Sequence, residues 1–356
     1  MIYKFLVRPI IFLFKPETIH RVVCRFLVVV SKIPGATYVI RKLFVVDHPI
    51  LEKKILGLTF KNQVGLAAGF DKNATFIDEL ADFGFSFVEI GTITPRSQSG
   101  NEMPRLFRLP KDKALINRMG FNNIGAEAVI NKLIKRKSTV IVGANIGKNK
   151  STDNDFAYTD YNSCFESLYP YVDYFVINVS SPNTKGLRDL QAAKPLKTLL
   201  VGIIKLRQLK EKFKPILLKI SPDLTDDQLL EVIKILKETE LDGVVATNTT
   251  TGRQSLKTPT EKISLIGDGG LSGQPLFDRS NEIIAMLRFH LGPAFPIIGV
   301  GGIMSATDAL KKIEAGADLI QIYTGFVYQG PSLIKQINKA IINSKKDRNM
   351  KLTPLE

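Results

Sequence analysis

Ser181 is the residue whose chemical role is most open, because a serine just after a strand can serve several purposes. It lies in VINVSSPNTKGLR (residues 176–188), where β-branched residues give way to small polar ones and to Pro182, which ends a sheet. Such a serine could be a nucleophile, a proton acceptor, a phosphate ligand or a turn residue. A serine nucleophile needs an adjacent base. The pattern disfavours acyl transfer, because no G-x-S-x-G is present and none of the three histidines follows a predicted strand.

Two short glycine-rich segments point to a phosphate group. GVGGI (299–303) and YTG (323–325) follow the seventh and eighth predicted strands. In a barrel of alternating strands and helices, these two loops commonly bind phosphate through backbone N–H groups. Because GVGG does not match G-x-G-x-x-G, one phosphate site favours FMN or a phosphorylated substrate over NAD. Simple strand-to-helix spacing remains the alternative for either glycine of 301–302 alone.

Lysine and asparagine side chains gather at the same predicted edge. Lys72 follows the first predicted strand, and Lys219 lies at the end of the fifth. Both have otherwise apolar surroundings, where an ammonium needs an anionic partner. A reduced flavin or a substrate carboxylate would provide one. Amides suit a planar substrate with several carbonyl and N–H groups, and the asparagines at this edge are Asn117, Asn145, Asn178, Asn183 and Asn248. No cluster of histidines and carboxylates is present, so we expect no metal.

The elements that position these residues alternate regularly from about residue 60. Short β-branched runs are each followed by a helix-length amphipathic segment, which predicts a parallel sheet. The predicted strands are 64–69, 86–92, 139–146, 174–181, 215–221, 243–249, 296–302 and 319–325. The predicted helices are 73–83, 124–136, 160–172, 192–211, 225–239, 279–290, 306–315 and 331–343. Eight such pairs predict a closed (β/α)8 TIM barrel.

Two connections are longer than the others and are expected to serve the site. Residues 93–123 contain RLFRL and predict an extra hairpin, whereas residues 250–277 are expected to be a loop. We divide the chain into an N-terminal helical segment (1–45), the barrel (46–345) and a frayed tail (346–356).

Composition narrows the class of protein. The 356 residues carry 49 Lys and Arg against 34 Asp and Glu, a formal charge of +15. No basic run is interleaved with aromatic residues and tryptophan is absent, which disfavours nucleic acid and favours an anionic membrane surface. Cys24 and Cys164 are far apart, which fits neither a disulfide scaffold nor a zinc site. Both are expected to pack as small apolar residues.

The N-terminus is apolar without being long enough to cross a bilayer. FLVRPIIFLF (5–14) and RFLVVV (25–30) are half the length of a spanning helix or less, and charged residues interrupt the region. A signal peptide would need a longer apolar run and a cleavage site of small residues. Two amphipathic helices lying in the membrane interface are predicted. The alternative is a helical pair packed only on the barrel.

Ten motifs together resemble one family. In order they are GLAAGFDKN, EIGTITPRSQSGNEMPRLFRL, INRMGFNN, NIGKNK, INVSSPNTKGLR, LKISPDL, ATNTT, GGLSGQPL, PIIGVGGI and QIYTGF. Over about residues 50–340 the chain resembles dihydroorotate dehydrogenase, and FKPETIHR resembles the membrane-associated extension of its quinone-dependent class 2. The resemblance implies a barrel holding one non-covalent FMN and oxidation of dihydroorotate to orotate in pyrimidine biosynthesis, with a membrane quinone as acceptor.

The resemblance also assigns roles to individual residues. Ser181 falls on the catalytic base, where class 1 enzymes carry cysteine. FMN contacts are implied for Ala67, Ala68, Gly69, Phe70, Asp71, Thr92, Asn145, Asn178, Lys219, Thr247, Gly273, Gly302, Tyr323 and Thr324. Substrate contacts are implied for Lys72, Asn117, Arg118, Met119, Gly120, Phe121, Asn178, Asn183, Asn248 and Thr249. His20, Arg108 and Tyr323 would border the quinone channel.

Two alternatives stay open at this point. One is another FMN barrel, such as a dihydropyrimidine or dihydrouridine reductase, although cysteine would be expected there as the acid. The other is a membrane-surface binding protein without enzyme activity. The expected protein is a monomer on the cytoplasmic face of a bacterial cell membrane.

Overall fold

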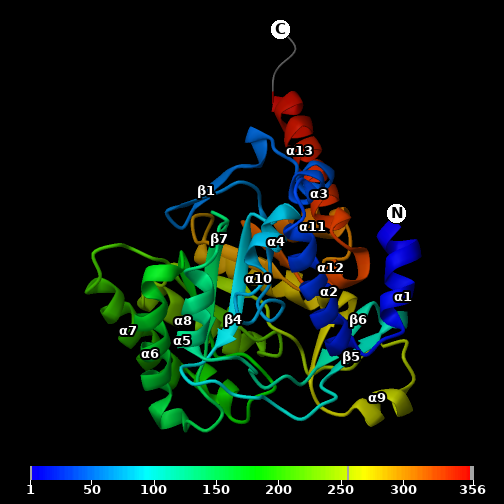
Figure 1. Ribbon diagram of the computed structural model, residues 1–356. Coiled ribbons are helices and arrows are strands. Elements are labelled where there is room, and N and C mark those ends of the chain that lie inside the picture. Colours follow the sequence, from blue (N-terminus) through cyan, green and yellow to red (C-terminus); the bar gives the residue numbers. More distant parts are fainter. Residues whose placement is uncertain (1, 255, 353–356) are drawn as a thin grey trace.

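A closed barrel of eight parallel strands forms the centre of the computed structural model, which describes residues 2–254 and 256–352 (Figure 1). Each strand pairs with its neighbours in chain order, and the last pairs with the first. The strands are β3 (Val64–Leu66), β4 (Phe87–Ile93), β7 (Ile141–Ile146), β8 (Tyr174–Asn178), β9 (Ile216–Ile220), β10 (Gly243–Ala246), β12 (Ile297–Val300) and β13 (Leu319–Ile322). All eight predicted strands are confirmed.

Helices surround the barrel and bury one apolar face against the strands. They are α4 (Ile77–Asp82), α5 (Ala126–Leu133), α6 (Ala157–Leu168), α7 (Ala193–Gln208), α8 (Asp226–Glu238), α10 (Phe277–Leu291), α11 (Ala306–Glu314), α12 (Thr324–Gln329) and α13 (Ser332–Leu352). Local signals set their ends. Thr225 and Gln228 form a capping box at the start of α8, and Gly292, at φ +80°, follows the end of α10.

The inside of the barrel is apolar at its amino-terminal end. There the hairpin of β1 (Lys53–Ile55) and β2 (Leu58–Phe60) brings Phe60 against Phe87 of β4, with ring centroids 5.2 Å apart. This cluster consists of Phe60, Ala67, Phe87, Tyr174, Val176, Leu217, Val245, Ile298, Val300 and Leu319. Because this end is filled with large side chains, a ligand site is expected at the carboxyl ends of the strands.

The two long connections together make a second sheet. β5 (Leu106–Leu109) and β6 (Ala114–Asn117) form the predicted hairpin, and β11 (Gly270–Gly273) adds to β6. The expectation of a plain loop over 250–277 is therefore wrong. That connection also contains α9 (Thr260–Ile266), which begins after Pro259 and buries Ile266 against Leu109 and Leu271. Short 3-10 turns are Pro49–Leu51, Pro110–Asp112, Asn154–Phe156, Tyr169–Tyr171, Leu187–Gln191 and Gln274–Leu276.

The N-terminal region has more helical pieces than the two predicted. A π-helix (Tyr3–Val7) runs into α1 (Arg8–Phe12), and α2 (Pro16–Ser31) and α3 (Ala36–Phe44) follow. Pro16 starts α2, and Gly35, at φ +82°, separates α3 from it. Among the described helices, none alone is long and apolar enough to cross a membrane; α2 and α3 pass that test only jointly, with a 114° bend between them.

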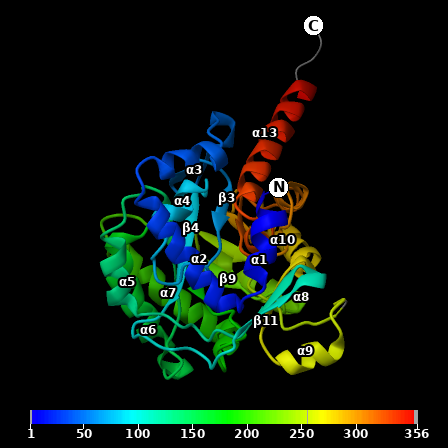
Figure 2. The same ribbon diagram turned by 45° about the vertical axis from the view of Figure 1, so that its right-hand side comes forward.

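The N-terminal helices contact the last helices of the barrel. The π-helix contacts α12; α2 and α3 contact α4, and α3 also contacts α13. In Figure 2 the red end of α13 projects from the barrel. α13 continues beyond the predicted start of the tail at residue 346 as far as Leu352, while residues 353–356 lie outside the described part. Cys24 and Cys164 are both buried and unpaired, as predicted.

Candidate functional site

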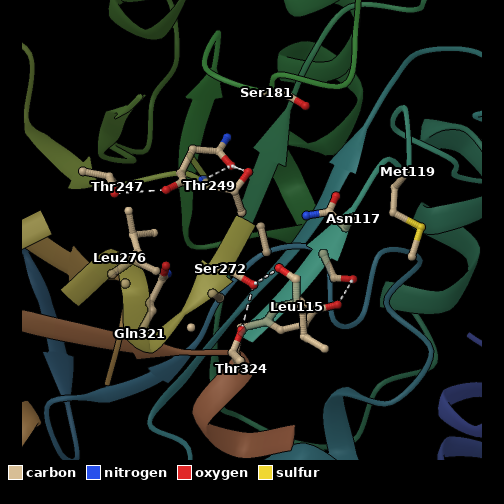
Figure 3. Close-up of a pocket in the computed structure, with 18 of the residues that line it drawn as sticks. Leu115, Asn117, Met119, Ser181, Thr247, Thr249, Ser272, Leu276, Gln321 and Thr324 are labelled. Atoms are coloured by element: carbon tan, nitrogen blue, oxygen red, sulfur yellow. Dashed lines mark hydrogen bonds between the residues drawn. The ribbon is translucent and has the colours of Figure 1, made fainter. Parts of the chain in front are cut away.

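A pocket lies at the carboxyl ends of the barrel strands, with the second sheet as one wall (Figure 3). It brings together most of the predicted residues, from the ends of seven of the eight barrel strands, all but β7. The predicted residues that line it are Ala67, Ala68, Gly69, Lys72, Thr92, Asn117, Met119, Gly120, Phe121, Asn178, Ser181, Asn183, Lys219, Thr247, Asn248, Thr249, Gly273, Gly302, Tyr323 and Thr324. Their roles as ligand contacts stay predictions.

Four predicted residues lie behind the pocket wall instead. The carboxylate of Asp71 accepts the backbone N–H groups of residues 75 and 76 (2.8 and 2.7 Å), and so shapes the loop that carries Lys72. Phe70 packs edge-on against Tyr323. Arg118 points away from the pocket and donates to the carbonyl of Ile266 (2.7 Å). This contact links the hairpin to α9. The fourth, Asn145, is buried one layer beneath the lining.

Asn145 belongs to a buried amide network that orders the pocket floor. Its Oδ1 accepts the Thr92 hydroxyl (2.6 Å) and the Asn178 side-chain amide (2.9 Å). Asn178 also donates to Thr92 Oγ1 (2.9 Å), and its Oδ1 accepts from Asn248 (3.3 Å). Buried amides that bond to one another in this way have fixed orientations. The network therefore presents the pocket-facing atoms of Thr92, Asn178 and Asn248 in one arrangement.

Glu89 is a central residue of the site that the sequence reasoning missed. It lies on β4, fully buried, and its carboxylate accepts hydrogen bonds from Asn145 Nδ2 (2.7 Å) and Gln321 Nε2 (2.6 Å). The ammonium of Lys219 is 3.2 Å from its Oε1. Lys219 thus has a protein carboxylate as its anionic partner. The signal was present in the sequence, because FVEIG and LIQIY each place one polar residue inside an otherwise apolar strand.

Ser181 lies on the loop after β8 and is buried to 6% exposure at the pocket (Figure 3). Its Oγ accepts the backbone N–H of Asn183 (3.3 Å). No histidine is near, since His48 caps the turn at Pro49–Leu51, His290 lies near the end of α10 and His20 is on α2. This placement agrees with the expectation that no Ser–His pair forms.

The loop that carries Ser181 is fastened by an arginine that the sequence did not single out. Arg188 donates to the carbonyls of Ser180 (3.2 Å) and Thr249 (3.1 Å) and forms an ion pair with Asp223 (2.8 Å). These three contacts join the loop after β8 to the loops after β9 and β10. The loop is therefore held at the pocket by a guanidinium with several simultaneous partners.

Lys72 has a neutral hydrogen-bond partner, and its ammonium loses its proton more readily than that of an exposed lysine. Its Nζ donates to Asn122 Oδ1 (2.6 Å). The pKa of Lys72 is lowered to about 7, mainly by burial and then by the Arg105 guanidinium, while the Glu17 carboxylate acts in the opposite direction. Glu17 of α2 and Arg105 form an ion pair at 2.8 Å. The N-terminal helix therefore contributes a charge that acts on a pocket residue.

Two glycines of the pocket, Gly302 of the predicted phosphate segment and Gly273 at the end of β11, are required by close packing. Gly302 has φ +74°, and a Cβ there would lie 2.4 Å from the Phe277 backbone. Gly273 has φ +102°, and its Cβ would lie 2.3 Å from the Lys113 carbonyl oxygen. Behind this loop the buried Lys312 donates to Ser280 Oγ (2.6 Å), and burial lowers the pKa of Lys312 to about 7. Both glycines therefore allow two backbone segments of the pocket wall to pack closely against each other.

The three residues predicted to border the quinone channel are not all in contact with one another. Tyr323 lines the pocket, and its hydroxyl donates to the Gly69 carbonyl (3.4 Å). His20 of α2 bonds through Nε2 to the Phe70 carbonyl (3.0 Å), and its ring packs edge-on against Phe70. Burial lowers the pKa of His20. Arg108 lies farther along, where it donates to the Phe14 carbonyl (2.8 Å) at the end of α1.

Comparison with known proteins gives consistent matches. The family of dihydroorotate dehydrogenases matches residues 50–344. "Dihydroorotate dehydrogenase (quinone)" of Christiangramia forsetii is 54% identical over 96% of this chain and 98% of its own length. The protein of the same name from Rhodococcus erythropolis is 46% identical over 94% and 93%. The crystal structure of Eimeria tenella DHODH in complex with ferulenol superposes with a TM-score of 0.81 at 35% identity, covering 94% of this chain and 93% of that one.

Proposed function

The chain belongs to the dihydroorotate dehydrogenase family, and from this membership we propose that it oxidises dihydroorotate to orotate and passes the electrons to a membrane quinone. The observation that carries the proposal is the 54% identity to a relative named dihydroorotate dehydrogenase (quinone) over 96% of this chain. That extent favours this activity over the other FMN-barrel reductases and over a binding protein without activity. The reaction is a step of pyrimidine biosynthesis.

The pocket fits FMN, which we propose as its single non-covalent cofactor. The loops that contain Gly302 and Thr324 line the pocket after the seventh and eighth barrel strands, where backbone N–H groups of such barrels commonly bind a phosphate. At the floor, Gln321 lines the pocket, and its buried side-chain oxygen lies beside the Tyr174 hydroxyl. The fixed polar groups of Thr92 and Asn178 line the same pocket and suit the hydrogen-bonding edge of a flavin ring. Lys219 would then face the ring from the same floor.

FMN, when bound, supplies the two-electron chemistry by accepting hydride from C6 of dihydroorotate. Ser181 would take the proton from C5. A serine hydroxyl is a weak base and must pass on its own proton. The buried Thr184 hydroxyl on the same loop, which has no partner among the described residues, would relay that proton to solvent by accepting one proton and releasing its own. Lys72 and the amides of Asn117 and Asn183 would hold the substrate carboxylate and ring in register.

The N-terminal helices would form the membrane-facing side. Large apolar side chains there point to solvent, including Phe5 (71% exposed), Leu6 (63%) and Leu13 (83%). Such a patch, with the basic side chains of the same segment, suits an anionic bilayer surface. We propose a monomer bound peripherally to the cytoplasmic face of a bacterial membrane. The quinone would reach the flavin between these helices and Tyr323, past His20 and Arg108.

A spectroscopic experiment tests the proposed activity. The purified protein should show a flavin spectrum that bleaches anaerobically when dihydroorotate is added and recovers when a soluble ubiquinone analogue follows. Dihydrouracil serves as the control substrate, because it lacks the carboxylate that Lys72 would bind. Bleaching by NADPH but not by dihydroorotate would refute the proposal.

A further inference from the structure

The buried carboxylate of Glu89 has no assigned role, and its surroundings are unusual for a barrel interior. It lies on β4 and accepts hydrogen bonds from residues of three other strands: Asn145 of β7, Lys219 of β9 and Gln321 of β13. Two of these three, Lys219 and Gln321, line the pocket. Figure 3 shows Gln321 at the floor of the pocket. The carboxylate therefore supports the floor from below without lining the pocket itself.

Because a buried carboxylate and ammonium are costly unless paired, the two charges depend on each other. Glu89 is 0% exposed and Lys219 is 5% exposed. The other ionisable group that faces this pair among the described residues is Tyr174 of β8, on which the Glu89 charge acts, and burial raises the pKa of Tyr174 far above its ordinary value. Tyr174 is therefore neutral and cannot replace either charge. The pair is isolated inside the barrel.

The chain offers an internal comparison: two buried lysines that have neutral hydrogen-bond partners and are influenced by carboxylates only from a distance. Lys72 bonds to the Asn122 amide, and Lys312 bonds to the Ser280 hydroxyl and the Asn281 amide (2.7 Å). Burial lowers the pKa of both lysines to about 7. Lys219 differs from them in having a carboxylate at 3.2 Å. A lysine at this depth keeps its proton when a carboxylate offsets the cost of burial.

We propose that Glu89 is a positioning residue that keeps Lys219 protonated beneath FMN in both the oxidised and the reduced enzyme. The inference rests on the proposed FMN site. With Glu89 present, Lys219 carries a fixed positive charge where negative charge develops when FMN gains two electrons. No proton then has to reach the buried lysine during turnover. Reduction takes up one proton per two electrons, and that proton arrives with the hydride.

Without Glu89, the proton balance changes. Lys219 would be neutral before reduction at alkaline pH, and the negative charge gained by FMN would draw one proton from solvent onto its Nζ. Reduction would then take up two protons per two electrons. For a two-electron couple, each proton taken up makes the midpoint potential fall by about 30 mV per pH unit. The slope of the midpoint potential against pH therefore gives the number of protons taken up per two electrons.

The test is a spectroelectrochemical titration of the FMN-loaded full-length protein between pH 7.5 and 9, with a chemical reductant and redox dyes. The wild type should show a slope of about 30 mV per pH unit. Glu89→Gln should show a slope of about 60 mV per pH unit, because its reduction takes up one further proton. Glutamine has nearly the same shape as glutamate, and the Gln321 amide can rotate so that its oxygen accepts a hydrogen bond from the new side-chain amide at position 89. Glu89→Asp retains the charge and should restore the wild-type slope, which a merely structural role would not do.

Glu238→Gln is the matched control, because Glu238 pairs with Lys197 on the outside of the barrel, and its slope should equal that of the wild type. A Glu89→Gln slope of about 30 mV per pH unit would overturn the inference. If the Glu89→Gln variant fails to retain FMN, the wild-type titration tests the inference by itself. A wild-type slope that corresponds to two protons per two electrons would also overturn the inference. The titration uses no dihydroorotate, so failure of the proposed activity is seen separately, as absence of bleaching by that substrate.

Discussion

Binding of the substrate carboxylate should weaken as pH rises through 7, because the predicted carboxylate ligand loses its charge there. The pKa of Lys72 is about 7, lowered mainly by burial and then by the Arg105 guanidinium, with the Glu17 carboxylate raising it. A lysine with a lowered pKa is charged below that value and neutral above it. The perturbation is therefore pH itself, and Glu17→Gln is a second way of changing the same charge.

The magnitude follows from the fraction of Lys72 that carries a proton. With a pKa of about 7, that fraction is about nine-tenths at pH 6 and about one-tenth at pH 8. If orotate binds only the charged form, its dissociation constant rises about tenfold between these pH values, or about 1.4 kcal/mol in binding free energy. Glu17→Gln removes the carboxylate that raises the pKa of Lys72, so its profile should shift to lower pH.

Orotate binding can be followed through the absorbance change of FMN at pH 6, 7 and 8. The wild type should show the tenfold rise, Glu17→Gln an earlier rise, and Lys72→Met weak binding without this pH dependence. The Glu238→Gln variant, which alters a remote surface carboxylate, should follow the wild type. A wild-type dissociation constant that changes by less than twofold from pH 6 to 8 would refute the assignment of Lys72 as the charged carboxylate ligand.

Three further predictions concern other parts of the site. Ser181→Ala should slow anaerobic flavin reduction by dihydroorotate about 100- to 10,000-fold in stopped flow while FMN stays bound; near-normal reduction would remove Ser181 as the base. Asp71→Ala should lower the free energy of unfolding by about 1–3 kcal/mol in urea titrations, since two backbone N–H groups lose their acceptor. Replacing Leu6, Ile10 and Leu13 by serine should reduce flotation with anionic vesicles and quinone reduction while leaving bleaching by dihydroorotate intact; unchanged flotation would contradict membrane docking through α1.

The barrel could be predicted from the sequence because its signals are local. Each buried parallel strand is a short β-branched run, such as the one ending at Asn178, and each is followed by an amphipathic helix. Polar residues at strand ends could likewise be placed in one pocket, since parallel strands bring their carboxyl ends to one rim. This reasoning located Ser181, Lys72 and Lys219 at the pocket without any knowledge of distances.

The remaining features depend on contacts between distant segments. β11 is short and glycine-rich, and it becomes a strand only because β6 offers an edge to pair with. Arg118 follows Asn117 in the sequence, yet it points to α9, because neighbouring residues on a strand face opposite sides. The partner of Lys219 is Glu89, 130 residues earlier, and no local pattern joins the two.

The contacts of the first residues have a consequence for how the chain is made. The Tyr3 hydroxyl bonds to the Val327 carbonyl (2.6 Å), 324 residues later, and Arg8 bonds to the Tyr328 carbonyl (3.1 Å). During synthesis the N-terminal helices leave the ribosome first, and their docking partners leave among the last. Since chains fold as they emerge, the apolar face of α1 stays undocked until the final βα unit is complete. Biogenesis of this enzyme therefore includes a long interval in which its apolar N-terminal segment is the exposed part of an unfinished protein.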